Sequence, residues 1–571
     1  MTYTDIYDAV SETYWPEGAW ERMLEAGEPE SFNLAEEALG RHAGSSETAL
    51  RIRDFATGGD EAYSFDELNR AANRAANFFE GHLDRGERFG LMLPPRLELY
   101  AALFGGVKTQ RVFLPLDTKF GPDALSYRMA DAEATTLFTT ADHLGKVESG
   151  EMPALERVVL VGEGSGSADG SRAVEGTGSI EGVEMLHYDE VERESDSYDA
   201  IRMAPTETYG MVYSSGTTGQ PSQLTSEHAT AVGIEPYITF VVDLLPEDTY
   251  FAAASPAWSY GLTVGTLAPG LQGTNIGAYR GRFDSEMWLD TLERWDVTNA
   301  MVAPTVFRQL RAGDVNVDAY DIDLRVLVTA GETCDGDTAA WIDEHFGTAP
   351  LDAYGLSEGG MLVCNYPFPD WEVKHGSMGK PTPGKEVRLC DGSECPPATE
   401  ENPAPTEEMV FIDEPGVVGE ICAYQSGGSG PMAGESPEGW QRMGDLAEVD
   451  EDGYWWYRGR ADKVIISAGY RIGPGEVQET LIDHDAVEEA GVIGVDHETR
   501  GNVVKAYVTL APGYEETPEL RDELVEFAKS ELSKHEYPRK LEIVDELPKT
   551  ASEKIKLGEL EKRHEREHGG A

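Results

Sequence analysis

The chain has 571 residues and a formal net charge of −59, because 105 acidic residues face 46 basic ones. That length exceeds what one hydrophobic core supports, so at least two folding units are expected. The charge opposes binding to nucleic acid or to an anionic membrane surface. Because the acids are spread along the whole chain, they indicate solvation in a high-salt cytosol, and therefore a halophilic protein, rather than a local binding patch.

The remaining composition predicts a cytoplasmic protein. No apolar run reaches the 18 residues of a membrane span, and the N-terminus lacks the pattern of a secretory signal. The five cysteines are few and odd in number, which favours a reducing compartment. Cys390 and Cys395 have no second Cys/His pair at zinc-site spacing, so we expect loop thiols there rather than a metal site. The oligomeric state is not indicated.

Alternating helix and strand patterns fill the first 200 residues. Residues 64–79 have a helical period, and residues 88–93 form a short apolar run typical of a strand. The alternation continues through residues 100–107, 111–116 and 136–139. Strands that alternate with helices predict parallel α/β layers. Residues 163–171, rich in Gly and Ser, read as a surface loop.

The middle of the chain continues this alternation, and a second unit follows it. A helix is expected over residues 285–295, strands over 300–303 and 324–329, loops over 392–409 and 425–438, and a hairpin return at 453–456. Beyond Asp462 we expect strands over 464–467, 486–495, 503–510 and 540–544 and helices over 474–483 and 518–532. About 110 residues are enough for a compact α+β domain. The boundary is expected near residues 460–463.

A loop rich in Ser, Thr and Gly follows the apolar strand of residues 210–213 and carries Ser214, Ser215, Gly216, Thr217, Thr218 and Gly219. Glycine allows close backbone approach, and the hydroxyls add donors, so a strand that runs into such a loop can cradle phosphate. The segment is not a Walker motif, because no Gly-Lys-Ser/Thr follows it. A flexible hydroxyl-rich turn is the alternative.

Three further segments accompany this loop: residues 354–358 (Tyr-Gly-Leu-Ser-Glu), residues 459–462 (Gly-Arg-Ala-Asp) and residues 547–555, which contain Lys554. In this order and spacing, the four segments resemble the core motifs of the acyl-adenylate-forming superfamily of acyl- and aryl-CoA synthetases, luciferases and peptide-synthetase adenylation domains. The likeness covers nearly the whole chain. Residues 469–555 are most similar to medium-chain acyl-CoA synthetases, with benzoate-CoA ligases as near relatives.

The resemblance implies a nucleotide site. Residues 214–219 would wrap the polyphosphate, and the other implied contacts are Gly331 and Glu332 beside adenine, Tyr354 stacked on adenine, Ser357 at the phosphate, and Asp445 and Arg460 at the ribose. Glu358 would ligate Mg²⁺, which prefers one or two carboxylates together with phosphate oxygens and water. A carboxylate such as Asp445 suits a cis-diol because it accepts two hydroxyl bonds. The alternative for each acid is a solvated surface ion.

The resemblance also implies a catalytic lid. Lys554 would bridge the substrate carboxylate and the α-phosphate, where two anions must meet. Arg471 would pair with the acyl-adenylate phosphate, since a planar guanidinium suits bidentate contact. Gly469 would leave space for the pantetheine arm of coenzyme A, and Asp462 would be the hinge between the domains.

Trp258 and Tyr260 lie where the family places its acyl pocket, and ordinary core aromatics are the alternative. Acetate-specific members shorten this pocket with a Trp near the second motif. Gly355 follows the aromatic residue here, so we expect room for a medium-chain or aromatic acid. Three positions depart from the family pattern. Ser222 and Ile466 stand where lysine is usual, and Glu553 stands where glycine is usual.

The sequence therefore predicts an α/β protein with a large N-terminal AMP-binding domain of layered α/β subdomains (residues 1–461) and a small mobile α+β lid (residues 462–571). The expected activity is an AMP-forming acid–thiol ligase that uses ATP, Mg²⁺ and coenzyme A, with AMP as product. Two alternatives stay open. One is an adenylating enzyme that loads a carrier protein, and the other is a non-catalytic nucleotide or acyl-AMP binder.

Overall fold

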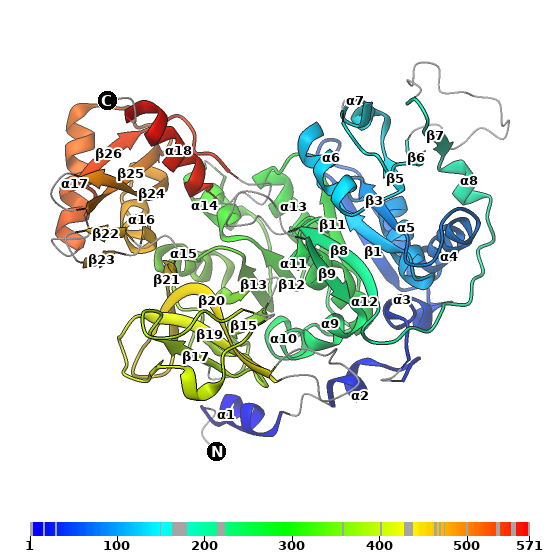
Figure 1. Cartoon of the computed structure of the whole chain (residues 1–571), viewed down its shortest axis with the longest axis horizontal. Coiled ribbons are helices and arrows are strands. Elements are labelled where there is room, and N and C mark those ends of the chain that lie inside the picture. Colours follow the sequence, from blue (N-terminus) through cyan, green and yellow to red (C-terminus); the bar gives the residue numbers. More distant parts are fainter. Residues whose placement is uncertain are drawn as a thin grey trace.

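The computed structural model describes residues 4–14, 18–28, 31–148, 150–162, 180–213, 223–313, 315–356, 359–369, 371–399, 402–426, 438–461, 465–467, 470–472, 474–497, 501–532, 537–549 and 555–568. These residues form five sheets with helices packed around them (Figure 1). Within these ranges, no helix combines the length and the apolar composition that crossing a membrane requires.

The largest sheet has the strand order β7-β6-β5-β3-β4-β8-β9. Its strands are β3 (Arg88–Met92), β4 (Val112–Pro115), β5 (Thr136–Thr139), β6 (Arg157–Leu160), β7 (Glu184–His187), β8 (Thr208–Tyr213) and β9 (Gln223–Glu227). All neighbours are parallel except β9, which returns antiparallel to β8. Helices α4 (Phe65–His82) and α5 (Leu97–Lys108) pack together, and α6 (Pro122–Asp131) follows β4. Helix α4 confirms the helix expected over residues 64–79, and Ser64 precedes it in a capping box with Glu67.

A second sheet has the order β10-β12-β13-β14-β15-β16. Its strands are β10 (Tyr250–Ala252), β12 (Asn299–Val302), β13 (Val326–Ala330), β14 (Leu351–Leu356), β15 (Gly360–Cys364) and β16 (Lys380–Pro381). Helices α13 (Ser285–Trp295), α14 (Pro304–Ala312) and α15 (Gly336–Phe346) accompany it. A small sheet joins β1 (Thr48–Asp54) to β2 (Asp60–Ser64) and to β11 (Ile276–Arg280). The expected parallel α/β layers are confirmed.

An antiparallel sheet follows, with the order β18-β17-β19-β20-β21. Its strands are β17 (Val387–Cys390), β18 (Phe411–Ile412), β19 (Gly419–Ser426), β20 (Glu438–Val449) and β21 (Trp455–Arg460). The expected hairpin return is the turn between β20 and β21, where Asp450 accepts the backbone N–H groups of Asp452 and Tyr454. The loop expected over residues 425–438 was wrong at both ends, because Gln425 pairs with Gly439 and Ser426 with Glu438 in the ladder.

The C-terminal unit has its own sheet and core. Its strands are β22 (Ile465–Ser467), β23 (Tyr470–Ile472), β24 (Val487–His497), β25 (Gly501–Leu510) and β26 (Lys540–Ile543), and its helices are α16 (Pro474–Ile482), α17 (Pro518–Glu531) and α18 (Leu557–His568). Its two apolar clusters contain only residues from 465 onward. In Figure 1 this unit, in orange and red, lies at the opposite end of the molecule from the blue layers, and its helix α16 contacts β21. The predicted fold class, a large N-terminal domain with a small C-terminal domain, is confirmed. Helix α18 was not predicted.

The N-terminal arm and the segment between β9 and β11 complete the described chain. The arm contains α1 (Thr4–Thr13) and α2 (Ala19–Met23), and α3 (Leu34–Ala38) follows it. Between β9 and β11 lie α9 (His228–Gly233), α10 (Glu235–Tyr237), α11 (Ser259–Leu262), α12 (Ala268–Gln272) and two π-helical turns, η4 (Ile238–Val242) and η5 (Thr263–Leu267). Short helices α7 (Leu144–Glu148) and α8 (Asp189–Glu192) border the largest sheet.

Candidate active site

Many predicted site residues lie outside the described residues: Ser214, Ser215, Gly216, Thr217, Thr218, Gly219, Ser222, Ser357, Glu358, Asp462, Gly469, Glu553 and Lys554. The strands around them are described. Tyr213, the last residue of β8, and Gln223, the first residue of β9, are register partners. Lys549 pairs with Ile555 on either side of Lys554. Arg471 lies in β23 opposite Ile466 of β22.

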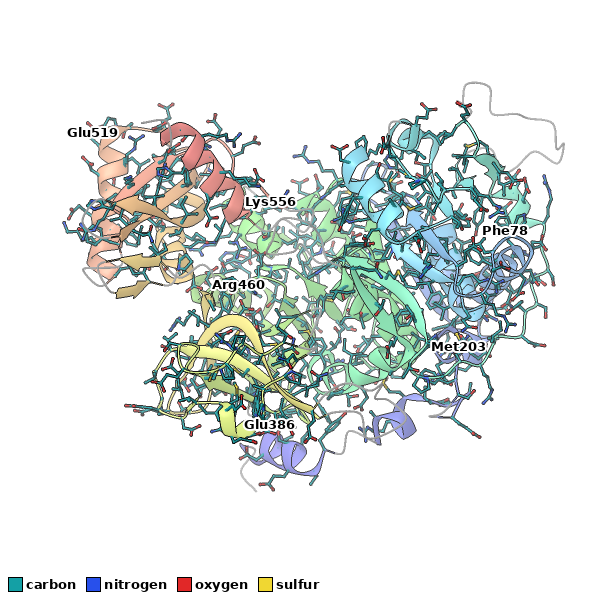
Figure 2. The ribbon with its side chains drawn as sticks, viewed as in Figure 1. Phe78, Met203, Glu386, Arg460, Glu519 and Lys556 are labelled. Carbon is teal, nitrogen blue, oxygen red and sulfur yellow. The ribbon has the colours of Figure 1, made fainter. Side chains whose placement is uncertain are left out.

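A buried carboxylate joins three of the residues predicted at the nucleotide. Asp445 of β20 is 4% exposed, and it accepts a hydrogen bond from the Tyr354 hydroxyl at 2.8 Å. Arg460 Nη1 of β21 lies 3.3 Å from the same Oδ2 atom. The other oxygen, Oδ1, accepts from the Tyr457 hydroxyl at 2.9 Å. The structure thus brings Tyr354, Asp445 and Arg460 together from three strands. Figure 2 labels Arg460 where the β17–β21 sheet meets the C-terminal unit.

The electrostatics of this cluster define the direction of each hydrogen bond. Burial, reinforced by the charge of Asp445, raises the pKa of Tyr354 and of Tyr457 well above the usual value for tyrosine. Both phenols therefore keep their protons at neutral pH and donate to the carboxylate. A carboxylate has about four lone-pair sites, and three of those of Asp445 accept from Tyr354, Tyr457 and Arg460.

Tyr457 is a member of this cluster that the sequence analysis missed. The hairpin places Asp445 opposite Arg460, and a register shift sets Tyr457 opposite Ala447. The hairpin return and the alternation of strand side chains could have brought Arg460 to Asp445 from sequence alone. Tyr457 could not be placed in that way, because the register shift between Leu446 and Ala447 decides which residues face the carboxylate.

Gly331 and Trp258 connect the expected adenine wall to the expected acyl pocket. Gly331 has φ +96°, and a Cβ atom there would lie 2.8 Å from Cη2 of Trp258. Glycine at this position is therefore required both by the left-handed backbone and by the indole that packs against it. Trp258, predicted in the acyl pocket, and Gly331, predicted beside adenine, are direct neighbours.

Glu332 is held by helix α14. Its Oε1 atom accepts from the backbone N–H of Thr305 at 2.7 Å and from the Thr305 hydroxyl, and its Oε2 atom pairs with Arg308. Thr305 lies in the first turn of α14, so the carboxylate also interacts favourably with the helix N-terminus. Although burial opposes its charge, the carboxylates of Glu332 and Asp335 keep the pKa of Arg308 above its usual value. These contacts fix the segment that follows Gly331.

Aromatic side chains meet in the expected acyl pocket. The ring centroids of Trp258 and Tyr260 are 5.2 Å apart, and both side chains are partly exposed. The Tyr260 hydroxyl is hydrogen-bonded to the hydroxyl of Tyr237, a residue that the sequence analysis did not single out. No pattern in the sequence connects these tyrosines, because α10 and α11 bring them together only in the fold.

Gly355 has a packing reason of its own. A Cβ atom at this position would lie 2.6 Å from the carbonyl oxygen of Gly360 and 2.6 Å from Sδ of Met361, both on the neighbouring strand β15. The register between β14 and β15 shifts at Tyr354 and Gly355. The close approach of β15 therefore demands glycine at 355, whichever acid the pocket accepts.

Together these residues can bind a nucleoside next to a group of aromatic side chains. The carboxylate of Asp445 suits a diol, and the Tyr354 ring presents an aromatic face. Among the described residues, no group of three His, Cys, Asp or Glu side chains is arranged to hold a metal ion, and Glu358 lies outside them.

Comparison with known proteins places the chain in a family. Residues 40–432 match the family of AMP-binding enzymes, and residues 476–554 match the C-terminal domain of AMP-binding enzymes. The first match covers more than half of the chain, so this protein belongs to the AMP-binding enzyme family.

Two curated relatives and one solved structure resemble almost the whole chain. Acetyl-coenzyme A synthetase of Bacillus subtilis (strain 168) is 35% identical, covering 92% of this chain and 89% of its own. The mitochondrial acyl-coenzyme A synthetase ACSM3 of Rattus norvegicus is 29% identical, covering 99% and 96%. The crystal structure of Brucella canis acyl-CoA synthetase has a TM-score of 0.70 and 29% identity, covering 98% and 99%. The predicted membership and the predicted enzyme class, an AMP-forming acid–thiol ligase, are confirmed.

Proposed function

We propose that this protein activates a carboxylic acid with ATP at the Asp445 cluster and then transfers the acyl group to coenzyme A. The observation that carries the proposal is the buried Asp445 carboxylate, which accepts hydrogen bonds from three donors, Tyr354, Tyr457 and Arg460. In the first step, a carboxylate oxygen attacks the α-phosphorus, which gives acyl-AMP and pyrophosphate. In the second step, the thiol of coenzyme A attacks the acyl carbon, AMP leaves and the thiol proton is released to solvent, so atoms and charge balance.

The chain's own residues would divide this work. Residues 214–219 hold the polyphosphate, Asp445 and Arg460 hold the ribose, and Tyr354 packs on adenine. Lys554 compensates the negative charges of the carboxylate and the α-phosphate as they approach each other, because a positive charge in a site that excludes water stabilises such a transition state. Arg471 then pairs with the phosphate of the adenylate.

Two bound groups complete the proposal. Glu358 would hold Mg²⁺, which screens the charge of the triphosphate when bound. Gly469 would leave a path for the pantetheine arm of coenzyme A. The two-domain division at residues 461 and 462 is part of the proposal, with Asp462 as the hinge about which the C-terminal unit turns between the two steps.

The acid is proposed to be medium-chain or aromatic, since Trp258 and Tyr260 border the pocket. The relative named for acetyl-coenzyme A makes acetate the alternative to exclude. We further propose a high-salt cytoplasm as the habitat, because the net charge is −59 and all five cysteines are free thiols.

The test measures pyrophosphate release in several molar KCl with Mg·ATP and coenzyme A, across acids from acetate to decanoate and benzoate. A peak at medium-chain or aromatic acids supports the proposal, and a peak at acetate refutes the acid class. Lys554→Ala should lower the rate at least about 100-fold. Lys556→Ala, two residues further along the chain and exposed, is the matched control and should keep the rate.

Two outcomes would support other functions. Pyrophosphate release without any acyl-CoA product would favour loading of a carrier protein. ATP binding without pyrophosphate release on any acid would indicate a non-catalytic binder, and the reversions Ser222→Lys and Glu553→Gly would then show whether these departures silence the site.

A further inference from the structure

Two tyrosine hydroxyls meet in the wall of the candidate acid pocket. Tyr237 ends α10 directly before the π-helical turn η4, and Tyr260 lies in α11 shortly before the π-helical turn η5. π-Helical turns are rare and often occur at functional sites, because they change the direction of the side chains around them. Here they flank two residues, 23 positions apart in sequence, whose hydroxyls are hydrogen-bonded to each other.

The two hydroxyls carry two protons, and the hydrogen bond between them needs only one. Each phenol carries one proton, and one of the two lies between the oxygens. Desolvation by burial raises the pKa of both tyrosines well above its usual value, so both protons are present at neutral pH. Within the described part of the chain, neither hydroxyl has another hydrogen-bond partner. The second proton therefore points at no protein acceptor there, although Tyr237 is only 1% exposed.

The N-terminal arm holds this tyrosine in place. Glu235, two residues before Tyr237, is 1% exposed. Its carboxylate accepts from Tyr14 at 2.8 Å, from Arg22 at 2.8 and 3.1 Å, and from Thr239 at 3.1 Å. A side chain whose backbone is anchored in this way is preorganised to make one directed hydrogen bond.

The neighbours of the hydroxyl pair fix its position relative to the expected adenine wall. Trp258 packs on Gly331, at the expected adenine wall, and its ring centroid is 5.2 Å from that of Tyr260. Tyr260 in turn reaches Tyr237, which belongs to the main apolar core. The hydroxyl pair is thus one ring further from the nucleotide wall than Trp258, where the end of an acid remote from its carboxylate would lie.

We propose that Tyr237 and Tyr260 donate a hydrogen bond to an oxygen at the far end of the acid, so the substrate class is oxygen-substituted carboxylic acids. The inference rests on the proposed function and sharpens its acid class. An unsubstituted alkyl or aryl end would leave a buried donor unpaired, whereas a hydroxyl, keto or ether oxygen would pair with it.

The test compares acids that differ only by hydroxyl against methyl: 4-hydroxybenzoate with 4-methylbenzoate, and 6-hydroxyhexanoate with heptanoate. The measured quantity is the ratio of kcat/KM within each pair, from pyrophosphate release. The wild type should favour the hydroxyl member of at least one pair by about tenfold or more. A ratio of one or below in both pairs would overturn the inference.

The variants Tyr237→Phe and Tyr260→Phe remove one hydroxyl each and keep the ring. The variant that removes the hydroxyl donating to the acid should bring the preferred pair's ratio to within about twofold of one, with KM for ATP unchanged, and a ratio kept by both variants would overturn the inference. Tyr250→Phe is the matched control, since Tyr250 is a buried tyrosine of the same core whose hydroxyl donates to the Val264 carbonyl at 3.2 Å. It should keep the wild-type ratio.

The outcomes separate this inference from the proposed function. Equal loss on both members of a pair in the Tyr→Phe variants would mean that the hydroxyls only support the fold, and would refute selective recognition. If the wild type releases no pyrophosphate with any acid, the proposed function and the inference are both refuted. If the wild type converts acids without preferring the oxygen-substituted member, the proposed ligase function is supported, and only the role of the tyrosine pair in substrate recognition is refuted.

Discussion

Asp445→Asn tests the nucleoside site directly. The substitution keeps the shape of the side chain but removes its charge and replaces one acceptor oxygen with an N–H₂ donor. In the wild type, Oδ1 accepts from Tyr457 at 2.9 Å and Oδ2 accepts from Tyr354 at 2.8 Å, with Arg460 at 3.3 Å. The asparagine can keep one of the two tyrosine bonds, and it has one acceptor oxygen instead of two.

The expected loss follows from these contacts. A hydrogen bond to a charged group contributes about 1.5–3 kcal/mol, which corresponds to a rise of about 10- to 150-fold in KM for ATP. KM for the acid should stay unchanged, because the acid does not contact Asp445. Tyr457→Phe removes one donor but keeps the charge, so its effect on KM for ATP should be about 2- to 10-fold.

The assay pairs each enzyme with ATP and with 2′-deoxy-ATP, and measures pyrophosphate release over a range of nucleotide concentrations. The wild type should discriminate against the deoxy nucleotide. Asp445→Asn should discriminate much less, because the missing 2′-hydroxyl and the missing carboxylate are the two partners of the same hydrogen bond, which can be lost only once. If the variant disfavours 2′-deoxy-ATP as strongly as the wild type does, Asp445 does not bind the ribose, and the cluster is structural.

Further predictions concern the hinge, a buried acid and the net charge. Asp462→Pro should leave acyl-adenylate formation intact and suppress thioester formation, both measured as separate half-reactions; equal loss of both would rule out a hinge role. Burial raises the pKa of Asp352 to about 8. As pH rises, the unfolded chain therefore loses the Asp352 proton at a lower pH than the folded protein does. The free energy of unfolding falls between about pH 4 and pH 8 as a result. The melting temperature of Asp352→Asn minus that of the wild type should therefore increase as pH rises through this window. A difference that does not change with pH would contradict the linkage. The net charge of −59 should make the melting temperature rise steeply with KCl concentration, and a flat response would refute halophilic adaptation.

Local patterns were sufficient to predict several helices and strands. The period of residues 64–79 predicts α4, and residues 285–295 coincide with α13. Such elements follow from side-chain periodicity and capping, which act over a few residues. Two of the missed features lacked this signal. Helix α18 is dominated by charged residues, and the ends of β19 and β20 depend on a ladder partner rather than on their own composition.

The resemblance to the family predicted Tyr354, Asp445 and Arg460 at one nucleotide site, and the fold brings their side chains together. Their geometry came from the fold. A register shift between β20 and β21 turns Tyr457 toward Asp445, and Trp258 packs on the bare backbone of Gly331. The sequence alone determined which side chains the site can use, since residue type sets charge and hydrogen-bonding capacity. Only the tertiary structure decided which hydroxyls meet, as with Tyr237 and Tyr260, because such contacts depend on how separate helices and strands pack.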